Sequence, residues 1–178
     1  MGCDIHLYVE SKPKNSDIWF TTGFGGEFSE RNYEIFAKLA GVRGEPDHET
    51  FIEPRGVPEN ICWGTLQGYT LHVMDDDKYN EDTYYQCSGD FCNRSSAEKW
   101  VKNGYSRYWD DNKVLITGPD WHSASWLTFE EFEKIINTIN LDELGYNKQY
   151  PDYVALLEYM RVFHNYGRDV RIVFWFDN

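Results

Sequence analysis

The chain opens with Met1-Gly2-Cys3-Asp4-Ile5-His6-Leu7-Tyr8-Val9-Glu10, a stretch in which apolar and polar residues alternate. Successive side chains of a strand point to opposite faces, so this alternation predicts a strand whose Ile5, Leu7 and Val9 face a core. The opposite face then carries Asp4 and His6 together with other polar side chains. A row of ionisable groups at this position predicts a functional site on the first strand.

The segment Val170-Arg171-Ile172-Val173-Phe174-Trp175-Phe176 predicts a last, buried strand. We hypothesise that the first and last strands are neighbours in one sheet. Their pairing would place Asp4 and His6 on the same face as Arg171 and Trp175. The two ends of the sequence would then hold the sheet together and also form one wall of the site.

Hydrophobic periodicity and capping signals predict the remaining elements. The helix signals are an apolar i, i+3, i+4, i+7 pattern after residue 32 and capping boxes that begin at Ser95 and Thr128. The predicted helices cover residues 33–40, 95–104, 128–139 and 152–166, and further strands cover residues 18–22, 70–74 and 114–117. Loops are predicted at residues 23–26, 44–69 and 75–82.

Together these elements predict an α+β fold in a single domain over residues 1–178. We expect a mixed or antiparallel sheet that includes the N- and C-terminal strands, about four helices and a long irregular loop region. A hydrophobic content of 41% argues against disorder.

Charge and composition narrow the classes of partner. A net charge of −13 repels nucleic-acid backbones and anionic membranes, so we expect neither as a direct partner. The sequence has no signal-peptide pattern and no apolar run of about 20 residues, which predicts a cytoplasmic protein with free thiols. Aromatic residues make up 17% of the chain, a surplus of rings that could stack on a ligand.

The Asp-x-His spacing of Asp4 and His6 returns at Asp120 and His122. Residues i and i+2 of a strand point the same way, so such pairs suit a divalent metal ion. Asp-Ile-His also resembles the first motif of calcineurin-like metallophosphoesterases, but the later Gly-Asn-His and Gly-His-x-His elements are absent. A two-metal site is therefore incomplete. The alternative is that Asp4 and His6 are hydrogen-bonded partners beside the core.

Arg55 lies between a rigid proline and a flexible glycine in the long loop, where its guanidinium could bind a phosphate or carboxylate. Arg43, which follows the predicted helix of residues 33–40, could join it in one pocket. The alternative is an ordinary surface pair of Arg55 with Glu53 or Glu59.

The segment from His122 to Ser125 directly precedes the predicted helix start at Thr128. Free N–H groups at a helix start attract anions, and the hydroxyls of Ser123 and Ser125 could add donors. Rings for stacking would come from Trp121, Trp126 and Trp175. The alternative is an ordinary turn with capping serines.

Several of these segments together carry a family resemblance. They are Met1–His6, Arg31–Arg43, Pro54–Pro58, Asp120–Thr128 and Val170–Asn178. They resemble a family of small uncharacterised proteins common in bacteriophage genomes and prophages, whose fourth motif reads His-Ser-His-Ser-Trp. This chain has Ala124 in place of the second His. The resemblance implies a phage setting, and the host cytoplasm as location, without assigning an activity.

We therefore expect a phage-type accessory protein, with a role in counter-defence, that binds a small anionic, nucleotide-like ligand without turnover. One alternative is a metal-dependent hydrolase or phosphoesterase that uses the Asp-x-His motifs and a divalent metal cofactor. Another alternative is an acidic inhibitor that binds a host protein through its surface. The sequence favours binding over catalysis because the catalytic set is incomplete.

Overall fold

The computed structural model describes residues 2–28, 31–44, 50–80, 91–107, 115–138 and 151–178. These residues form two compact units, described here separately: unit 1 comprises Met1–Cys62 and His122–Asn178, and unit 2 comprises Trp63–Trp121. The fold is α+β, as predicted. The single domain over residues 1–178 stays a prediction. None of the described helices is both long enough and apolar enough to cross a membrane.

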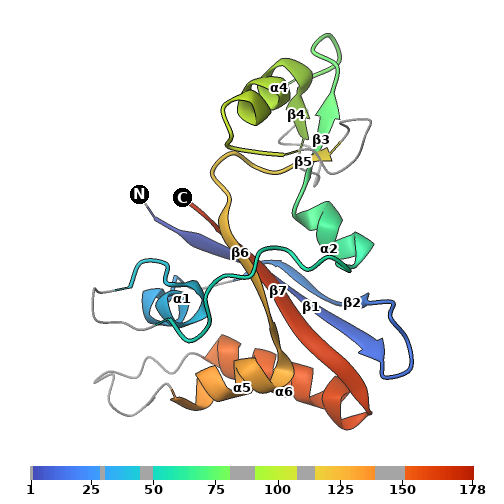
Figure 1. Ribbon diagram of the computed structural model, residues 1–178, viewed down its shortest axis with the longest axis vertical. Helices are drawn as coiled ribbons and strands as arrows, with labels where there is room; N and C mark the ends of the chain where they lie inside the picture. The colour runs from blue at the N-terminus through green and yellow to red at the C-terminus, as the bar shows by residue number, and fades with distance from the viewer. Residues whose placement is uncertain (1, 29–30, 45–49, 81–90, 108–114, 139–150) are drawn as a thin grey trace. The chain divides into compact units, whose positions relative to one another are not determined.

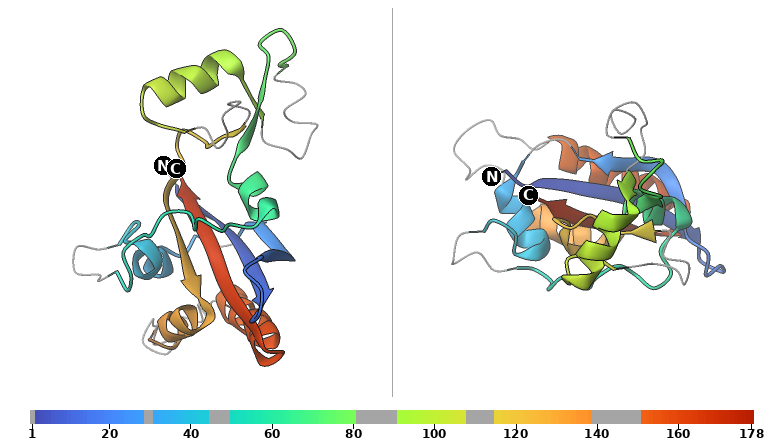
Figure 2. Two further views of the ribbon diagram at one scale, coloured as in Figure 1. Left: turned by 45° about the vertical axis from the view of Figure 1, so that its right-hand side comes forward. Right: turned by 90° about the horizontal axis from the view of Figure 1, so that it is seen from above.

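Unit 1 contains an antiparallel sheet of four strands in the order β2-β1-β7-β6. The strands are β1 (Asp4–Pro13), β2 (Phe20–Glu27), β6 (His122–Thr128) and β7 (Arg168–Asp177). Strands β1 and β7 run side by side over their whole length, from the pair Asp4 and Asp177 to the pair Pro13 and Arg168 (Figure 1, Figure 2). The hypothesis that the first and last strands are neighbours is therefore confirmed.

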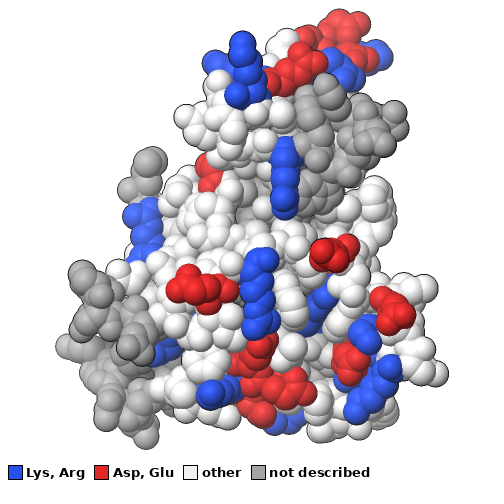
Figure 3. All heavy atoms as spheres, in the orientation of Figure 1, with Lys and Arg blue, Asp and Glu red and all other residues white. Residues whose placement is uncertain are grey.

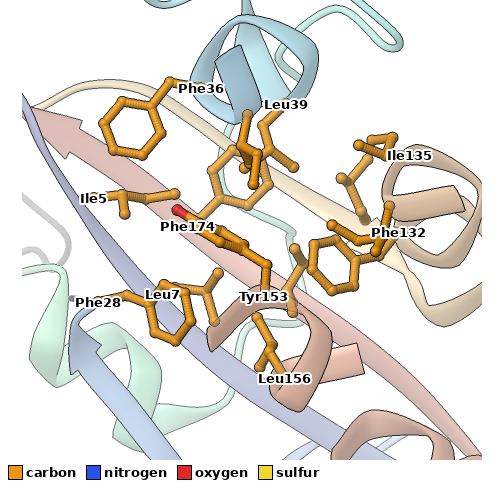
Figure 4. Close-up of a cluster of buried hydrophobic side chains, with 14 of the residues drawn as sticks. Ile5, Leu7, Phe28, Phe36, Leu39, Phe132, Ile135, Tyr153, Leu156 and Phe174 are labelled. Carbon is orange, nitrogen blue, oxygen red and sulfur yellow. The ribbon is translucent and has the colours of Figure 1, made fainter. Parts of the chain in front are cut away.

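Three helices of unit 1 cover one face of this sheet: α1 (Tyr33–Ala40), α5 (Phe129–Thr138) and α6 (Pro151–Asn165). Their apolar side chains meet Ile5 and Leu7 of β1 and Phe174 of β7 in one buried cluster (Figure 4). Phe36 of α1 and Phe132 of α5 are fully buried there. The alternation of the first decapeptide thus sets the faces of β1, since the odd-numbered residues enter the core.

Helix boundaries follow local capping contacts. In α1, the Asn32 side chain accepts a hydrogen bond from the Ile35 N–H at 3.2 Å, and Gly41 ends the helix with a φ of 66°. In α5, the Thr128 N–H donates to Glu131 at 2.9 Å, and the Glu131 N–H donates back to Thr128 Oγ1 at 3.3 Å. The capping box predicted at Thr128 is therefore confirmed.

Two predictions on the sheet of unit 1 are wrong. The predicted loop of residues 23–26 belongs to β2, which begins at Phe20 rather than at residue 18. Glycines can extend a strand where another group lies against the backbone. A Cβ at Gly25 would lie 2.2 Å from the Tyr8 ring, so the ring occupies the place of a side chain. The second error is that β6 was predicted as a turn.

The described residues of unit 2 form a small mixed sheet in the order β4-β3-β5 and two helices. Its elements are α2 (Trp63–Gly68), β3 (Leu71–Met74), β4 (Phe91–Asn93), α4 (Arg94–Lys102) and β5 (Leu115–Ile116). Strand β3 pairs in parallel with β4 and antiparallel with β5. Helix α2 lies inside the predicted loop of residues 44–69, so that loop was extended too far.

The start of α4 also differs from the prediction. Its N-cap is Asn93, whose side chain accepts from the Ser96 N–H at 2.8 Å. Ser95, the predicted cap, lies inside the helix, and its N–H donates to Asp76 at 3.1 Å. Residues 81 and 82 of a predicted loop, residue 114 of a predicted strand and residue 139 of a predicted helix lie outside the described residues.

Candidate functional site

Asp4 and His6 lie on the face of β1 that points away from the core. Asp4 accepts hydrogen bonds of 2.6 and 2.7 Å from Arg31, which lowers the pKa of this carboxyl below its usual range. The Nε2 of His6 lies 2.9 Å from Asp177, and its ring stacks on Trp175 with centroids 5.3 Å apart. Both predicted metal ligands therefore have partners within the protein.

The contacts of Arg31 also explain the opening residues. A Cβ at Gly2 would lie 2.0 Å from a guanidinium nitrogen of Arg31, so the guanidinium lies directly on the backbone there. Cys3 and Ile5 are fully buried. The opening segment therefore fits a structural role, in which each of these side chains has a place in unit 1.

The remaining predicted metal ligands belong to different units, since Asp120 lies in unit 2 and His122 in unit 1. Within the described ranges, no group of three or more His, Cys, Asp or Glu residues is arranged to hold a metal ion. The metal-dependent hydrolase therefore stays a prediction without a described set of ligands.

The guanidinium of Arg55 forms an ion pair within the protein and is therefore not available to bind an anion. It donates hydrogen bonds of 2.9 and 2.5 Å to the two carboxylate oxygens of Glu131, and its guanidinium lies 4.7 Å from the centre of the Trp126 ring. The ion pair predicted as the alternative exists, but with Glu131 instead of Glu53 or Glu59. Figure 3 shows several Lys and Arg side chains lying beside Asp and Glu side chains.

Arg171 and Arg43 are bonded in the same way. The buried Arg171 donates to Glu10 at 2.7 Å and to the Asn60 side chain at 2.8 Å. Arg43 donates to the Asn178 side chain at 2.8 Å. Arg55, Arg43 and Arg171, three of the predicted site residues, thus bind groups of unit 1 itself.

The segment from His122 to Ser125 is the first part of β6 (His122–Thr128), which runs directly into α5. Ser125 is buried and accepts a hydrogen bond of 3.1 Å from the Arg55 N–H, while Ser123 Oγ lies 3.1 Å from the Nδ1 of His122. Neither serine caps α5, because Thr128 does so. The helix start is therefore filled by the protein's own side chains, which weakens the anion site predicted there.

The three tryptophans predicted to stack on a ligand have different surroundings in the structure. Trp175 is fully buried, and Trp126 lies against Arg55. Trp121 stacks on Tyr69 in unit 2, with centroids 5.8 Å apart. Trp121 and Trp126 are half-buried, and each of the three rings has a neighbouring side chain within the protein.

A pocket of about 450 Å³ lies in unit 2. It is lined by Lys99, Trp100, Asn103, Tyr105, Pro119 and Asp120. Pockets for small molecules typically have volumes of about 300–1,000 Å³. Aromatic, cationic, amide and carboxylate side chains meet here, so we take this pocket as the candidate functional site.

One wall of the pocket is built by the end of α4. Gly104 has a φ of 77°, and the chain turns back so that the Tyr105 N–H donates to the Trp100 carbonyl at 3.1 Å. This bond spans six residues, as in the Schellman motif that ends many helices at a glycine. Lys99 and Asn103 lie one helical turn apart. The helix end thus brings two aromatic rings and two polar side chains to one place.

Of these lining residues, only Asp120 was among the residues selected from the sequence. The capping box at Ser95 and the Gly104 stop predicted the helix, but nothing local predicts that its last turn faces residues 119 and 120. The separation along the chain hides this contact.

No known protein family, curated protein or solved structure matches the chain. The function is therefore inferred from the residues and their geometry.

Proposed function

We propose that the protein binds a small anionic, nucleotide-like ligand in the pocket of unit 2 and does not turn it over. The proposal rests on one observation: Trp100, Tyr105 and Lys99 line the same pocket of about 450 Å³. Aromatic faces stack on planar bases, and an ammonium group binds a phosphate.

Charge and exposure in the pocket support this ligand. Within the described residues, Lys99 has no ion-pair partner, so its charge is available to a ligand. Tyr105 is 63% exposed, so its ring face is accessible to a stacked base. The net charge of −13 opposes an anion at long range, so we expect micromolar rather than nanomolar affinity.

The lining also supports binding over catalysis. It offers one carboxylate, of Asp120, and contains no His, Cys or Ser. General acid–base catalysis needs a positioned proton donor and acceptor, and nucleophilic catalysis needs an activated nucleophile. Among the described residues, no hydrogen bond joins the side chains of Lys99, Tyr105 and Asp120, so they do not form such an arrangement. In the phage setting that the family resemblance implies, such a protein would sequester a nucleotide signal from a host defence system.

The test is calorimetric titration of the purified protein with AMP, GMP, CMP and UMP. We expect saturable binding to one site per chain for at least one nucleotide, lost in Lys99→Ala and in Tyr105→Ala. Both side chains are exposed, so the variants should stay folded. The matched control is Lys102→Ala, on the same helix but outside the pocket lining.

Three outcomes would contradict the proposal. The first is the absence of binding heat with all four nucleotides. The second is conversion of a bound nucleotide, which chromatography of the mixture after prolonged incubation would reveal. The third is a loss of binding in Lys102→Ala as large as in Lys99→Ala, which would place the binding site outside the pocket.

A further inference from the structure

Asp120 is held in the pocket of unit 2 by a rigid turn. The Trp121 N–H donates to the Gly118 carbonyl at 3.3 Å, which closes a turn with Pro119 and Asp120 at its centre. Proline fixes its own φ and suits the first central position of such a turn. The backbone of Asp120 is therefore ordered before any ligand arrives.

The turn is also packed tightly from one side. A Cβ at Gly118 would lie 2.7 Å from the Trp121 ring, and this ring stacks on Tyr69. The glycine thus lets the indole lie on the turn, and the indole in turn is held by a second ring. This support orders the backbone from which the Asp120 side chain projects, which lowers the cost of ordering on binding.

The carboxylate of Asp120 is exposed and free to bind. Among the described residues, none pairs with it or donates a hydrogen bond to it. A carboxylate presents two acceptor oxygens side by side, which match two parallel N–H donors. Guanine has such a pair in its N1–H and 2-amino groups, whereas adenine presents an acceptor at N1.

We propose that the pocket selects guanine among nucleotide bases, with Asp120 accepting from N1–H and the 2-amino group. Trp100 and Tyr105 supply the stacking faces, and Lys99 binds the phosphate, as in the proposed function on which this inference rests. Adenine is rejected because its N1 lone pair would face the carboxylate. Adenine therefore loses both charge-assisted hydrogen bonds to the carboxylate and binds more weakly than guanine.

The experiment compares GMP, IMP and AMP by calorimetry on the full chain. IMP lacks the 2-amino group and keeps N1–H, so it measures the second hydrogen bond. We expect IMP to bind about tenfold and AMP about a hundredfold more weakly than GMP, from the strength of charge-assisted hydrogen bonds. In Asp120→Asn, which loses one acceptor oxygen, the preference of GMP over IMP should fall to less than about threefold.

The control is Glu98→Gln, an exposed carboxylate on α4 that does not line the pocket and should leave the preference unchanged. Saturable binding of GMP and AMP with equal affinity would overturn guanine selection while leaving the proposed function standing. A preference for GMP that survives in Asp120→Asn would overturn the role of Asp120. Absence of binding with every nucleotide would contradict both proposals.

Discussion

Arg171→Met is expected to lower the free energy of unfolding by about 3–5 kcal/mol, as for other buried ion pairs that lose one partner. The side chains of Arg171 and Glu10 are 4% and 0% exposed, and their closest N–O distance is 2.6 Å. Without the guanidinium, Glu10 would keep one hydrogen bond, from the Cys62 N–H at 2.9 Å, and an uncompensated buried charge. That charge supplies most of the expected cost.

Smaller contributions come from the loop that Arg171 anchors. Its guanidinium also donates to the side chain and carbonyl of Asn60, at 2.8 and 2.9 Å, and lies 4.0 Å from the centre of the Trp19 ring. Each such hydrogen bond contributes about 0.5–1.5 kcal/mol. Met keeps much of the volume of the aliphatic stem, so the cavity cost should be small.

The measurement is equilibrium unfolding in urea, followed by circular dichroism and tryptophan fluorescence. Arg161→Met is the matched control, because Arg161 pairs with Glu133 at 2.6 Å but is 34% exposed. Exposed pairs contribute about 0–1 kcal/mol, so this variant should lose no more than that. In Glu10→Leu/Arg171→Met, removal of both charges should restore at least about 2 kcal/mol relative to Arg171→Met alone. The reasoning fails if Arg171→Met costs no more than Arg161→Met.

Three further results are expected. Phe174→Ala should cost about 3–5 kcal/mol in the same unfolding assay, because a fully buried ring leaves a cavity, and a loss below about 1 kcal/mol would contradict its place in the core. Arg31 lowers the pKa of Asp4 below its usual value, so their pair should slightly stabilise the protein above that range of pH. In acid titrations the difference in stability between wild type and Arg31→Met should vanish as pH falls through the lowered pKa, and a constant difference would refute this. Burial raises the pKa of Cys92 to about 11, so iodoacetamide at pH 8 should label the half-buried Cys62 before Cys92 in peptide maps, and equal labelling would count against it.

Patterns that repeat along the chain predicted most of the fold. Alternation in the first decapeptide, the apolar run from Val170 and the capping box at Thr128 each report on local backbone geometry, and the structure confirms all three elements. The errors arose where local signals conflict with long-range contacts. Gly25 indicates a loop by itself, yet the Tyr8 ring lies against it and keeps the segment in β2.

The candidate site was harder to predict for the same reason. Arg55 in a loop has the same appearance in the sequence whether it faces a ligand or a carboxylate, and its partner Glu131 lies 76 residues away. The pocket of unit 2 likewise combines a helix end with Pro119 and Asp120, which no spacing rule connects. Among the residues selected from the sequence, Asp120 alone lines the pocket.

The pairing of β1 with β7 affects the order in which the protein can fold during synthesis. Asp4 of β1 pairs with Asp177 of β7, near the other end of the sequence. At ordinary translation rates β1 therefore leaves the ribosome roughly 10–30 s before β7 is complete. During that interval the apolar side chains of Ile5, Leu7 and Val9 lack their β7 neighbours. Unit 2, by contrast, is continuous in sequence and is complete before β7 emerges. Chaperone dependence and aggregation of nascent chains should therefore concentrate on the first strand.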